Sequence, residues 1–511
     1  MPGGARPGGS FRALSPRAAP DMPASAHTAP MSAADSRAVH PPLASLRLLA
    51  GQALSRAAGA PLVGGNRVQL LIDGEAHFQA WAGLIEDARR YVLLENYIIA
   101  DDVVGRRFRD LLIARARAGV RVALIHDWFG TLGNAGRAFF APLRAAGVLV
   151  RAFNRPRVDS PLGWIGRDHR KLLVVDGQVG SISGVCIAAK WLGDSARGVA
   201  PWRDSGVLIA GPAVADIETA FRDSWEGLGA PLTFPAAPQP QACGEVALRV
   251  IATLPAHGAM YRLDSLIAAM ATRSLWISDA YFVGIPTYVR GLAAAAADGV
   301  DVRLLVPGSN NLPAVGALSR AGYRPLLEAG IRVFEWNGSM MHAKTAVADG
   351  RWARVGSSNL NLSSWLANCE IDAAMEDTGF AGQMQEQYER DLDNATELQL
   401  KGRRPLPQAP LARNSRSGSS SRAAASALRL ANTVGAAIAN RRVLGNSERG
   451  VLSVAGGALL VLAVLGFWVP QLLAWPLATL CAWLGLSLLW RRWRPPDRAR
   501  RGPPGGVPRQ R

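Results

Sequence analysis

Two short, largely apolar runs in the chain, residues 172–175 and 345–348, are each followed directly by Asp-Gly. A short apolar run bounded by a turn signal is typical of a buried strand, and Asp-Gly is a preferred pair for a tight hairpin turn. The pattern therefore predicts the same local structure twice, namely a buried strand, a tight turn and a returning antiparallel strand.

The sequence around these runs also repeats, which is typical of two structural units of the same kind. The apolar segment 93–98 corresponds to 277–282, and in each copy it precedes an Ala-rich helical stretch, 107–118 or 287–297, and a Gly-Val turn into another strand. Such alternation of strand and helix is typical of an α/β unit. The chain is therefore predicted to have an α/β fold with two similar lobes, each a sheet flanked by helices.

Changes in composition predict the domain boundaries. Residues 1–58 are rich in Pro, Ala, Ser, Gly and Arg with little periodicity, which predicts disorder, and residues 1–50 have no long apolar segment typical of a secretory signal. The remaining predicted units are a first lobe at 59–233, a second lobe at 234–398 that begins with a Pro-rich connector, a basic linker at 399–450 with loose amphipathic periodicity, two apolar runs within 451–490, and a basic tail at 491–511.

The two C-terminal apolar runs, 451–468 and 471–490, contain no acidic or basic side chain. Each approaches the ~20 residues that cross a bilayer. Only Val469 and Pro470 separate them, so they predict a transmembrane helical hairpin. The alternative is a buried pair of core helices, but two complete lobes already have their own cores, and these runs are apolar on all sides.

Most of the net charge of +18 lies at this end of the chain, because residues 401–511 carry 18 Lys and Arg against Glu448 and Asp497. Arginines flank the apolar runs on both sides and are missing between them. The positive-inside rule then places both flanks, and the lobes, in the cytoplasm at a bacterial inner membrane. There the arginines would contact an anionic membrane surface, although a solvated tail would have the same composition.

A His and a Lys precede each predicted hairpin in the same frame. The frames, both reading H-x-K-x4-D, run from His169 through Lys171 to Asp176 and from His342 through Lys344 to Asp349. The chain has only 4 Lys among its 57 basic residues, so two lysines in matching frames indicate a need for a compact ammonium rather than a guanidinium. Side chains two apart on a strand share a face, so each imidazole and ammonium can contact one phosphate.

Paired His-Lys units suit phosphoryl transfer. One His attacks phosphorus, the other protonates the leaving alkoxide, and the two Lys neutralise the non-bridging oxygens. A single frame would be explained as well by a buried His beside a surface Lys, but the duplication favours the catalytic interpretation. The four cysteines have neither metal-ligand spacing nor a disulfide framework, so no metal or other cofactor is predicted and a reducing compartment is favoured.

The paired frames resemble the HKD motifs of the phospholipase D superfamily. The second copy matches the extended form H-x-K-x4-D-x6-G-S-x-x-N from His342 to Asn359, and flanking segments such as 94–98, 202–204 and 368–370 resemble bacterial cardiolipin synthases. The first copy departs from the family pattern, because Ser183-Gly184-Val185-Cys186 stands where the family usually has G-G-x-N. A weak thiol donor thus replaces a phosphate-contacting amide.

The resemblance implies an active site between the lobes. The residues it implies are His169, Lys171, Asp176, His342, Lys344 and Asp349 for catalysis, Ser357, Asn359, Ser364 and Cys186 for substrate binding, and Asp204 and Glu370 for orienting the histidines. Family precedent favours His169 as the nucleophile, although the residues themselves leave the order open. The positions of Asp176 and Asp349 past the strand favour a turn or an ion pair, the serines suit a small-residue turn, and the two orienting acids would also suit the surface.

The function implied is that of a membrane-bound phosphatidyltransferase that forms cardiolipin from phosphatidylglycerol through a phosphatidyl-histidine intermediate. A phospholipase D hydrolase and a phosphatidylserine synthase remain alternatives, while two intact frames disfavour a degenerate lipid-binding scaffold. Nearly neutral lobes disfavour a nuclease, since a nucleic-acid groove needs a basic stripe. The expected partners are therefore phospholipids, with no nucleic acid, and the second lipid is either phosphatidylglycerol or phosphatidylethanolamine.

Overall fold

The computed structural model describes residues 41–155 and 166–400, together with a few isolated positions between 460 and 482. The predicted basic linker, the basic tail and nearly all of the predicted hairpin lie outside these residues. Among these described residues, no helix combines the length and apolarity that crossing a bilayer requires.

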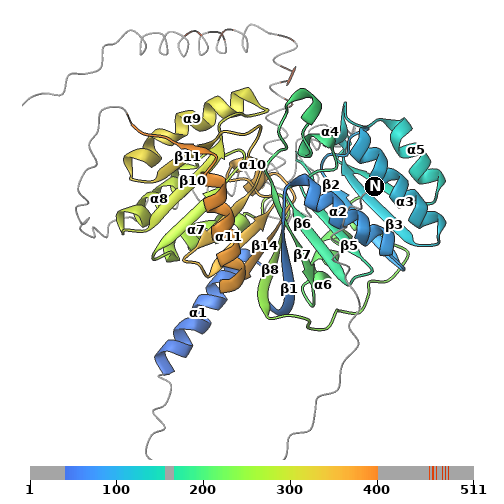
Figure 1. Cartoon of the computed structure of the whole chain (residues 1–511), viewed down its shortest axis with the longest axis horizontal. Coiled ribbons are helices and arrows are strands. Elements are labelled where there is room, and N and C mark those ends of the chain that lie inside the picture. The colour runs from blue at the N-terminus through green and yellow to red at the C-terminus, as the bar shows by residue number, and fades with distance from the viewer. Residues whose placement is uncertain are drawn as a thin grey trace, which may run out of the picture. The chain divides into compact units, whose positions relative to one another are not determined.

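One mixed sheet of fifteen strands organises this part of the chain (Figure 1). The first half of the sheet consists of β1 Val63–Ile72, β2 Tyr91–Asn96, β3 Arg121–Asp127, β4 Leu149–Phe153, β5 Lys171–Val175, β6 Val179–Ser183 and β7 Ser205–Ala210. The second half consists of β8 Val246–Thr253, β9 Ser274–Ser278, β10 Asp301–Pro307, β11 Arg332–Trp336, β12 Thr345–Ala348, β13 Trp352–Gly356, β14 Glu370–Glu376 and β15 Ala395–Glu397.

The strand order repeats on either side of the central β8–β1 pair. Outward from the centre it reads β1-β7-β6-β5-β2-β3-β4 in one direction and β8-β14-β13-β12-β9-β10-β11 in the other, with β15 added at the edge. In each half the outer three strands are parallel to one another and the hairpin strands are antiparallel. The internal repeat in the sequence is therefore a repeat of topology.

Helices cover both faces of each half. They are α2 Asp73–Asp87, α3 Val103–Arg117, α4 Trp128–Thr131, α5 Arg137–Ala145 and α6 Val214–Glu226 in the first half, then α7 Ala259–Met270, α8 Pro286–Ala297, α9 Pro313–Glu328, α10 Leu362–Leu366 and α11 Thr378–Leu392 in the second, with short 3-10 turns η2 Ala189–Trp191 and η3 Ser195–Arg197. Leu173 and Val175 of β5 face the α2, α3 and α5 core, whereas Leu172 and Val174 face α6. A strand buried on both faces explains the unbroken apolar run.

The two predicted hairpins form as the sequence indicates. Asp176 and Gly177 have φ of 54° and 67°, and Asp349 and Gly350 have φ of 53° and 65°. Positive φ at both central residues is the geometry that Asp-Gly adopts at low cost. The predicted strand-turn-strand units are thus confirmed as β5–β6 and β12–β13.

The N-terminal prediction needs a correction, because residues 41–58 of the segment expected to be disordered form helix α1, Pro41–Ala58. Leu54 and Ala58 at its end are buried in the core of the second half. A segment rich in Leu and Ala has high helix propensity, and burial of its last turn stabilises it further.

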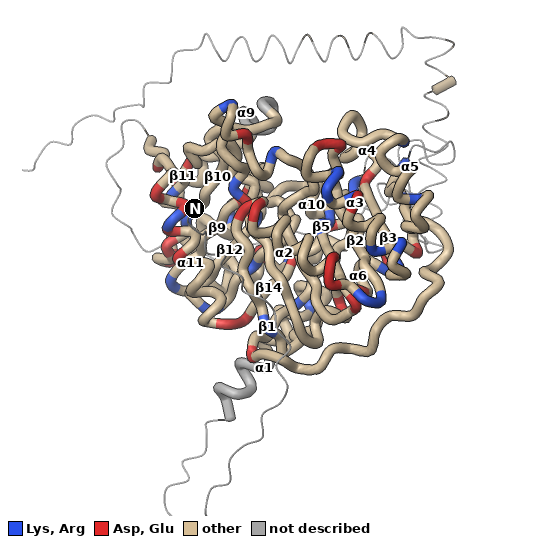
Figure 2. The backbone as a smooth tube through the Cα atoms, turned by 45° about the vertical axis from the view of Figure 1, so that its right-hand side comes forward, with Lys and Arg blue, Asp and Glu red and all other residues tan. Residues whose placement is uncertain are grey.

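The faces of the two half-sheets pack against each other through β6 and β7 on one side and β13 and β14 on the other. Val207, Ile209, Val355 and Ile371 share this core. Acidic and basic residues are interspersed over both halves (Figure 2). The packing brings together the strand ends that carry the two His-Lys frames.

Candidate active site

The two His-Lys frames lie where β5 and β12 begin, at the edge of the sheet that these strand ends form. Isolated β-bridges extend this edge, joining Asp168 to Cys369 and Arg203 to Met341. The backbone N–H of His169 donates to the Cys369 carbonyl at 2.9 Å, and that of His342 donates to the Arg203 carbonyl at 2.7 Å. Each histidine segment is therefore tied to a segment of the opposite half.

These bridges pair each histidine with a carboxylate from the other half of the chain. His169 Nδ1 lies 2.8 Å from Glu370 Oε2, and His342 Nδ1 lies 2.7 Å from Asp204 Oδ2. Both carboxylates are fully buried. Asp204 follows the first frame in the sequence and Glu370 follows the second, so each histidine contacts the acid from the other half. Each contact engages Nδ1 and leaves Nε2 as the ring nitrogen that is available for chemistry.

Each orienting carboxylate is itself held in place. Ser357 Oγ donates to Glu370 Oε2 at 2.6 Å, and Trp191 Nε1 donates to Asp204 Oδ2 at 2.9 Å. A Cβ at Gly184 would overlap the Asp204 carboxylate, so only glycine fits there. This second set of contacts reduces the freedom of the histidine rings.

Burial and neighbouring charges set the protonation states. Burial, with Lys344 next in importance, lowers the pKa of His342 to about 3, and burial also lowers the pKa of His169. Burial alone would raise the pKa of Asp204, but His342 and Lys344 outweigh it and hold the value at about 2. Neutral imidazoles that donate Nδ1–H to carboxylates keep a free Nε2 lone pair, as a nucleophile or base requires.

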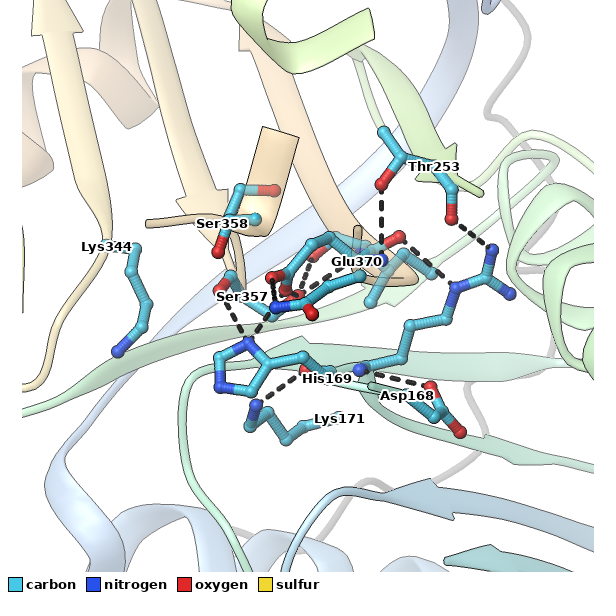
Figure 3. A network of polar contacts seen from close by, with 12 residues as sticks. Asp168, His169, Lys171, Thr253, Lys344, Ser357, Ser358 and Glu370 are labelled. Carbon is cyan, nitrogen blue, oxygen red and sulfur yellow. Dashed lines mark hydrogen bonds and ion pairs between the residues drawn. The ribbon is translucent and has the colours of Figure 1, made fainter. Parts of the chain in front are cut away.

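Both frame lysines point their ammonium groups into the site. Lys171 Nζ donates to the His169 carbonyl at 2.6 Å, and Lys344 Nζ donates to the His342 carbonyl. In Figure 3 both ammonium groups lie on the side of the His169 ring away from Glu370. Burial lowers the pKa of Lys344 to about 8 and also lowers that of Lys171. Two desolvated cations without an ion-pair partner among the described residues form a strong site for an anion.

The aspartates of the frames have a different place. Asp176 accepts from the backbone N–H groups of Arg89, Arg90 and Tyr91 at 2.7 to 2.9 Å. Asp349 likewise accepts from the backbone of residues 272–274. Both lie at the far end of a strand from the histidines, so the geometry gives them the turn role that their position favoured and not contact with the reacting atoms.

The four expected substrate-binding residues are all buried at the same edge. Ser357 uses its hydroxyl on Glu370, and the Ser364 backbone N–H is capped by Asn361 in α10. Asn359 Oδ1 has no hydrogen-bond partner in the described structure. The Cys186 thiol is buried, and burial raises its pKa, so it remains a weak donor. The Asn359 side-chain oxygen is therefore available to a ligand.

Aromatic rings that the sequence analysis did not assign to the site enclose both histidines. The ring centroid of Tyr97 lies 4.9 Å from that of His169, and Tyr281 lies 5.8 Å from His342. Trp202 also packs on His342, at 5.5 Å. Tyr97 and Tyr281 occupy equivalent positions in the sequence repeat, and that equivalence was the signal that could have identified them.

In residues 41–155 and 166–400, no three His, Cys, Asp or Glu side chains are grouped so that they could bind a metal ion. The arrangement instead offers two imidazoles with free Nε2 atoms and two ammonium groups. Such a set can bind a phosphodiester and exchange its ester partner by attack on phosphorus.

The frame lysines allow a direct test of the anion site. Lys171→Arg and Lys344→Arg should each lower transfer by about tenfold or more despite preserved charge, because a planar guanidinium does not fit a slot shaped around a buried ammonium. Turnover of a phosphodiester substrate in detergent micelles measures the effect. The exposed Arg324→Lys provides the matched control, and near-normal rates in both lysine variants would contradict the requirement for a compact cation.

Comparison with known proteins agrees with this geometry. A family model described as "Cardiolipin synthase, PLD-like domain" matches residues 266–392. Cardiolipin synthase A of Pseudomonas aeruginosa is 33% identical over 370 residues, which cover 70% of this chain and 73% of that protein. Cardiolipin synthase A of Pseudomonas entomophila is 33% identical over 348 residues, covering 66% of this chain and 71% of that protein.

Among solved structures, phosphatidylserine synthase from Haemophilus influenzae aligns with a TM-score of 0.55 at 15% identity, over 71% of this chain and 95% of that one. At this identity the likeness shows a shared fold. The sequence relatives show the family. The chain belongs to the cardiolipin synthase family of the phospholipase D superfamily and is a phosphatidyltransferase of that type.

Proposed function

We propose that this protein forms cardiolipin by moving the phosphatidyl group of phosphatidylglycerol, through a phosphatidyl-histidine, to the hydroxyl of a second lipid. The observation that carries the proposal is the crossed pair of His–carboxylate contacts, 2.8 and 2.7 Å long, beside two buried ammonium groups. The relatives named cardiolipin synthase A support the same reaction for this chain.

In the first half-reaction, Lys171 and Lys344 hold the phosphodiester and His169 Nε2 attacks phosphorus. The bond from phosphorus to the glycerol oxygen breaks, and His342 supplies the proton that the departing glycerol takes. The bound phosphate anion and Asp204 favour the protonated form of His342 that this step needs. We assign His169 as the nucleophile because the superfamily resemblance favours it.

In the second half-reaction, His342 accepts the proton of the incoming lipid hydroxyl. The hydroxyl oxygen attacks phosphorus, and the bond between phosphorus and His169 Nε2 breaks, which regenerates the enzyme. The side chains of His169 and His342 are 11% and 6% exposed. Such burial supports transfer over hydrolysis, because water has little access to the intermediate.

Exposed apolar side chains around the site support a lipid surface as the place of reaction. The residues in question are Val103, Phe129, Leu132, Leu192, Val199, Leu312 and Leu362, which we term the apolar rim. All lie in segments that follow the carboxyl ends of β2, β3, β6, β10 or β13, at the edge where the frames begin. Apolar side chains that face solvent around a site mark a surface for a partner, here the bilayer that contains the substrate.

The predicted hairpin at 451–490 would complete the attachment, with both flanks and the active site on the cytoplasmic side of a bacterial inner membrane. Its support is the sequence pattern of two uncharged runs between clusters of arginine. Interspersed charges over the two halves support lipid rather than nucleic acid as the partner (Figure 2).

A truncated protein that ends at residue 444 separates the two modes of attachment. Its binding to anionic vesicles should be salt-sensitive, and Leu132→Glu or Leu192→Glu should weaken that binding at least about fivefold, because a charge replaces an inserted apolar group. Vesicle sedimentation measures it. Leu149→Glu is the matched control, since Leu149 is 40% exposed but lies at the opposite edge, at the start of β4.

Two results would contradict this membrane assignment. Equal weakening by Leu149→Glu would remove the role of the apolar rim. Carbonate-resistant association of the truncated protein would show that the hairpin is not the anchor.

The proposed reaction itself is tested by lipid analysis of a cardiolipin-free host that expresses the full chain, with and without each candidate headgroup donor. Cardiolipin should appear whenever phosphatidylglycerol is present. Accumulation of phosphatidic acid in place of cardiolipin would identify a hydrolase instead.

A further inference from the structure

A third lysine reaches the active site from η2. Lys190 is one of only 4 lysines in the chain, and it joins Lys171 and Lys344 at the same edge. Its Nζ lies 4.8 Å from the ring centroid of Trp191 and 4.6 Å from that of Trp202. The same two rings pack on His342, at 5.4 and 5.5 Å. Lys190 and His342 therefore both contact the indole rings of Trp191 and Trp202.

The Lys190 ammonium has no ion-pair partner among the described residues. Asp102 is the acid whose charge acts on it, but the Asp102 carboxylate accepts from the backbone N–H groups of Val104, Gly105 and Ala189 at 2.7 to 3.0 Å. Burial lowers the pKa of Lys190, and the charge of Lys171 acts in the same direction. Two partly desolvated ammonium groups near each other are unfavourable until an anion lies between or beside them.

Lys190 also breaks the symmetry of the site. In the alignment that places His169 on His342, Lys190 corresponds to Ser363 in the second copy. The reacting phosphate already has a symmetric pair of ammonium groups from Lys171 and Lys344. A cation present in one copy alone fits a second anion that approaches the site from one side.

The acceptor lipid supplies such an anion. Its hydroxyl must reach His342, which accepts the proton in the proposed transfer, and its own phosphate is a short glycerol unit away. Trp202 contacts both groups, with its ring centroid 4.6 Å from Lys190 Nζ and 5.5 Å from the His342 ring centroid. A glycerol phosphate that hydrogen-bonds at both ends has the length to reach from one group to the other. An uncharged alcohol has no anionic group that could pair with the Lys190 ammonium.

We propose that Lys190, framed by Trp191 and Trp202, is a second anion subsite that binds the phosphate of the acceptor phospholipid while the acceptor hydroxyl lies at His342. The inference rests on the proposed transfer to a second lipid, and it makes Lys190 a specificity determinant for acceptors that carry phosphate. The reacting phosphate remains with Lys171 and Lys344.

The test compares three acceptors with phosphatidylglycerol as the donor throughout, using the full chain in detergent micelles. Deuterated glycerol is the uncharged acceptor, glycerol 3-phosphate is the soluble phosphate-bearing acceptor, and phosphatidylglycerol is the lipid acceptor. In Lys190→Gln the ratio of cardiolipin formation to glycerol exchange should fall at least about tenfold, the loss expected from one charge-assisted hydrogen bond. Lys190→Arg should restore part of that ratio because it keeps the charge.

Arg324→Gln is the matched control, because it removes an exposed positive charge on α9 and tests for general attraction of anionic lipid. It should leave the ratio unchanged. The subsite is refuted if Lys190→Gln lowers transfer to all three acceptors in parallel, which would place Lys190 on the reacting phosphate, or if it changes none of them. A loss confined to glycerol 3-phosphate would refute the lipid assignment.

Failure of the proposed function gives a different result. The wild-type protein would then exchange glycerol or release phosphatidic acid without forming any cardiolipin. The comparison of glycerol 3-phosphate with glycerol does not depend on a lipid acceptor, so it would still decide whether Lys190 binds phosphate.

Discussion

Alanine at either His169 or His342 is expected to lower cardiolipin formation by at least about a hundredfold, the smallest loss typical of removing a catalytic acid, base or nucleophile. Each imidazole is held at Nδ1 by its own carboxylate, so neither can take over the position of the other. Because both rings are nearly buried, small added imidazole should rescue either variant poorly.

The measurement is conversion of labelled phosphatidylglycerol to cardiolipin, with circular dichroism to verify the fold. His257→Ala, at an exposed position outside the frames, is the matched control and should retain activity. Trapping with labelled lipid should mark His169 in the His342→Ala protein and mark nothing in the His169→Ala protein. More than about a hundredth of the wild-type rate in either variant would exclude the two-histidine mechanism.

The crossed carboxylates lead to the second large effect. Glu370→Gln should behave like a loss of His169, and Asp204→Asn like a loss of His342, each slowing transfer by about a hundredfold. An amide can donate to Nδ1 and so favour the tautomer with hydrogen on Nε2, which removes the lone pair that the nucleophile needs. It also removes the charge that stabilises a protonated ring.

A phosphatidyl donor with a p-nitrophenolate leaving group separates the two effects, because this group departs without a proton. Asp204→Asn should still release a burst of p-nitrophenolate equal to the enzyme present and then stall, whereas Glu370→Gln should show no burst. Glu328→Gln, which affects only a surface pair with Arg324, serves as the control. The opposite result, in which Asp204→Asn loses the burst and Glu370→Gln keeps it, would contradict this assignment. Either each acid would then serve the histidine of its own half, or the nucleophile would be His342. The lipid-trapping experiment would distinguish these two explanations.

Much of the local fold was predictable because it depends on neighbours in the sequence. Asp-Gly after an apolar run determines a tight turn through backbone conformation alone, and both turns formed with positive φ at both central residues. The alternation of strand and Ala-rich helix likewise predicted α3 and α8 near their observed bounds. Helix α1 was missed because weak periodicity concealed the two residues, Leu54 and Ala58, that its packing buries.

Residues of the site could be predicted from the sequence where the residue type itself indicated the chemistry. The scarcity of lysine identified Lys171 and Lys344, and the same argument could have identified Lys190, which lacks the histidine that drew attention to the other two. In the sequence, Tyr97 and Tyr281 could be recognised only as tyrosines at equivalent positions of the repeat. Their proximity to the histidines depends on how the strand ends meet, which local patterns do not record.

The sequence by itself determined the two hairpins, the repeat and the His and Lys side chains of the two frames. Only the tertiary structure decided that His169 is oriented by Glu370 and His342 by Asp204. These partners are brought together because the apolar faces of β6, β7, β13 and β14 bury each other, which joins the strand ends of the two halves. Burial of those faces is non-directional and acts between distant segments, so no pattern within either copy could reveal which acid would meet which histidine.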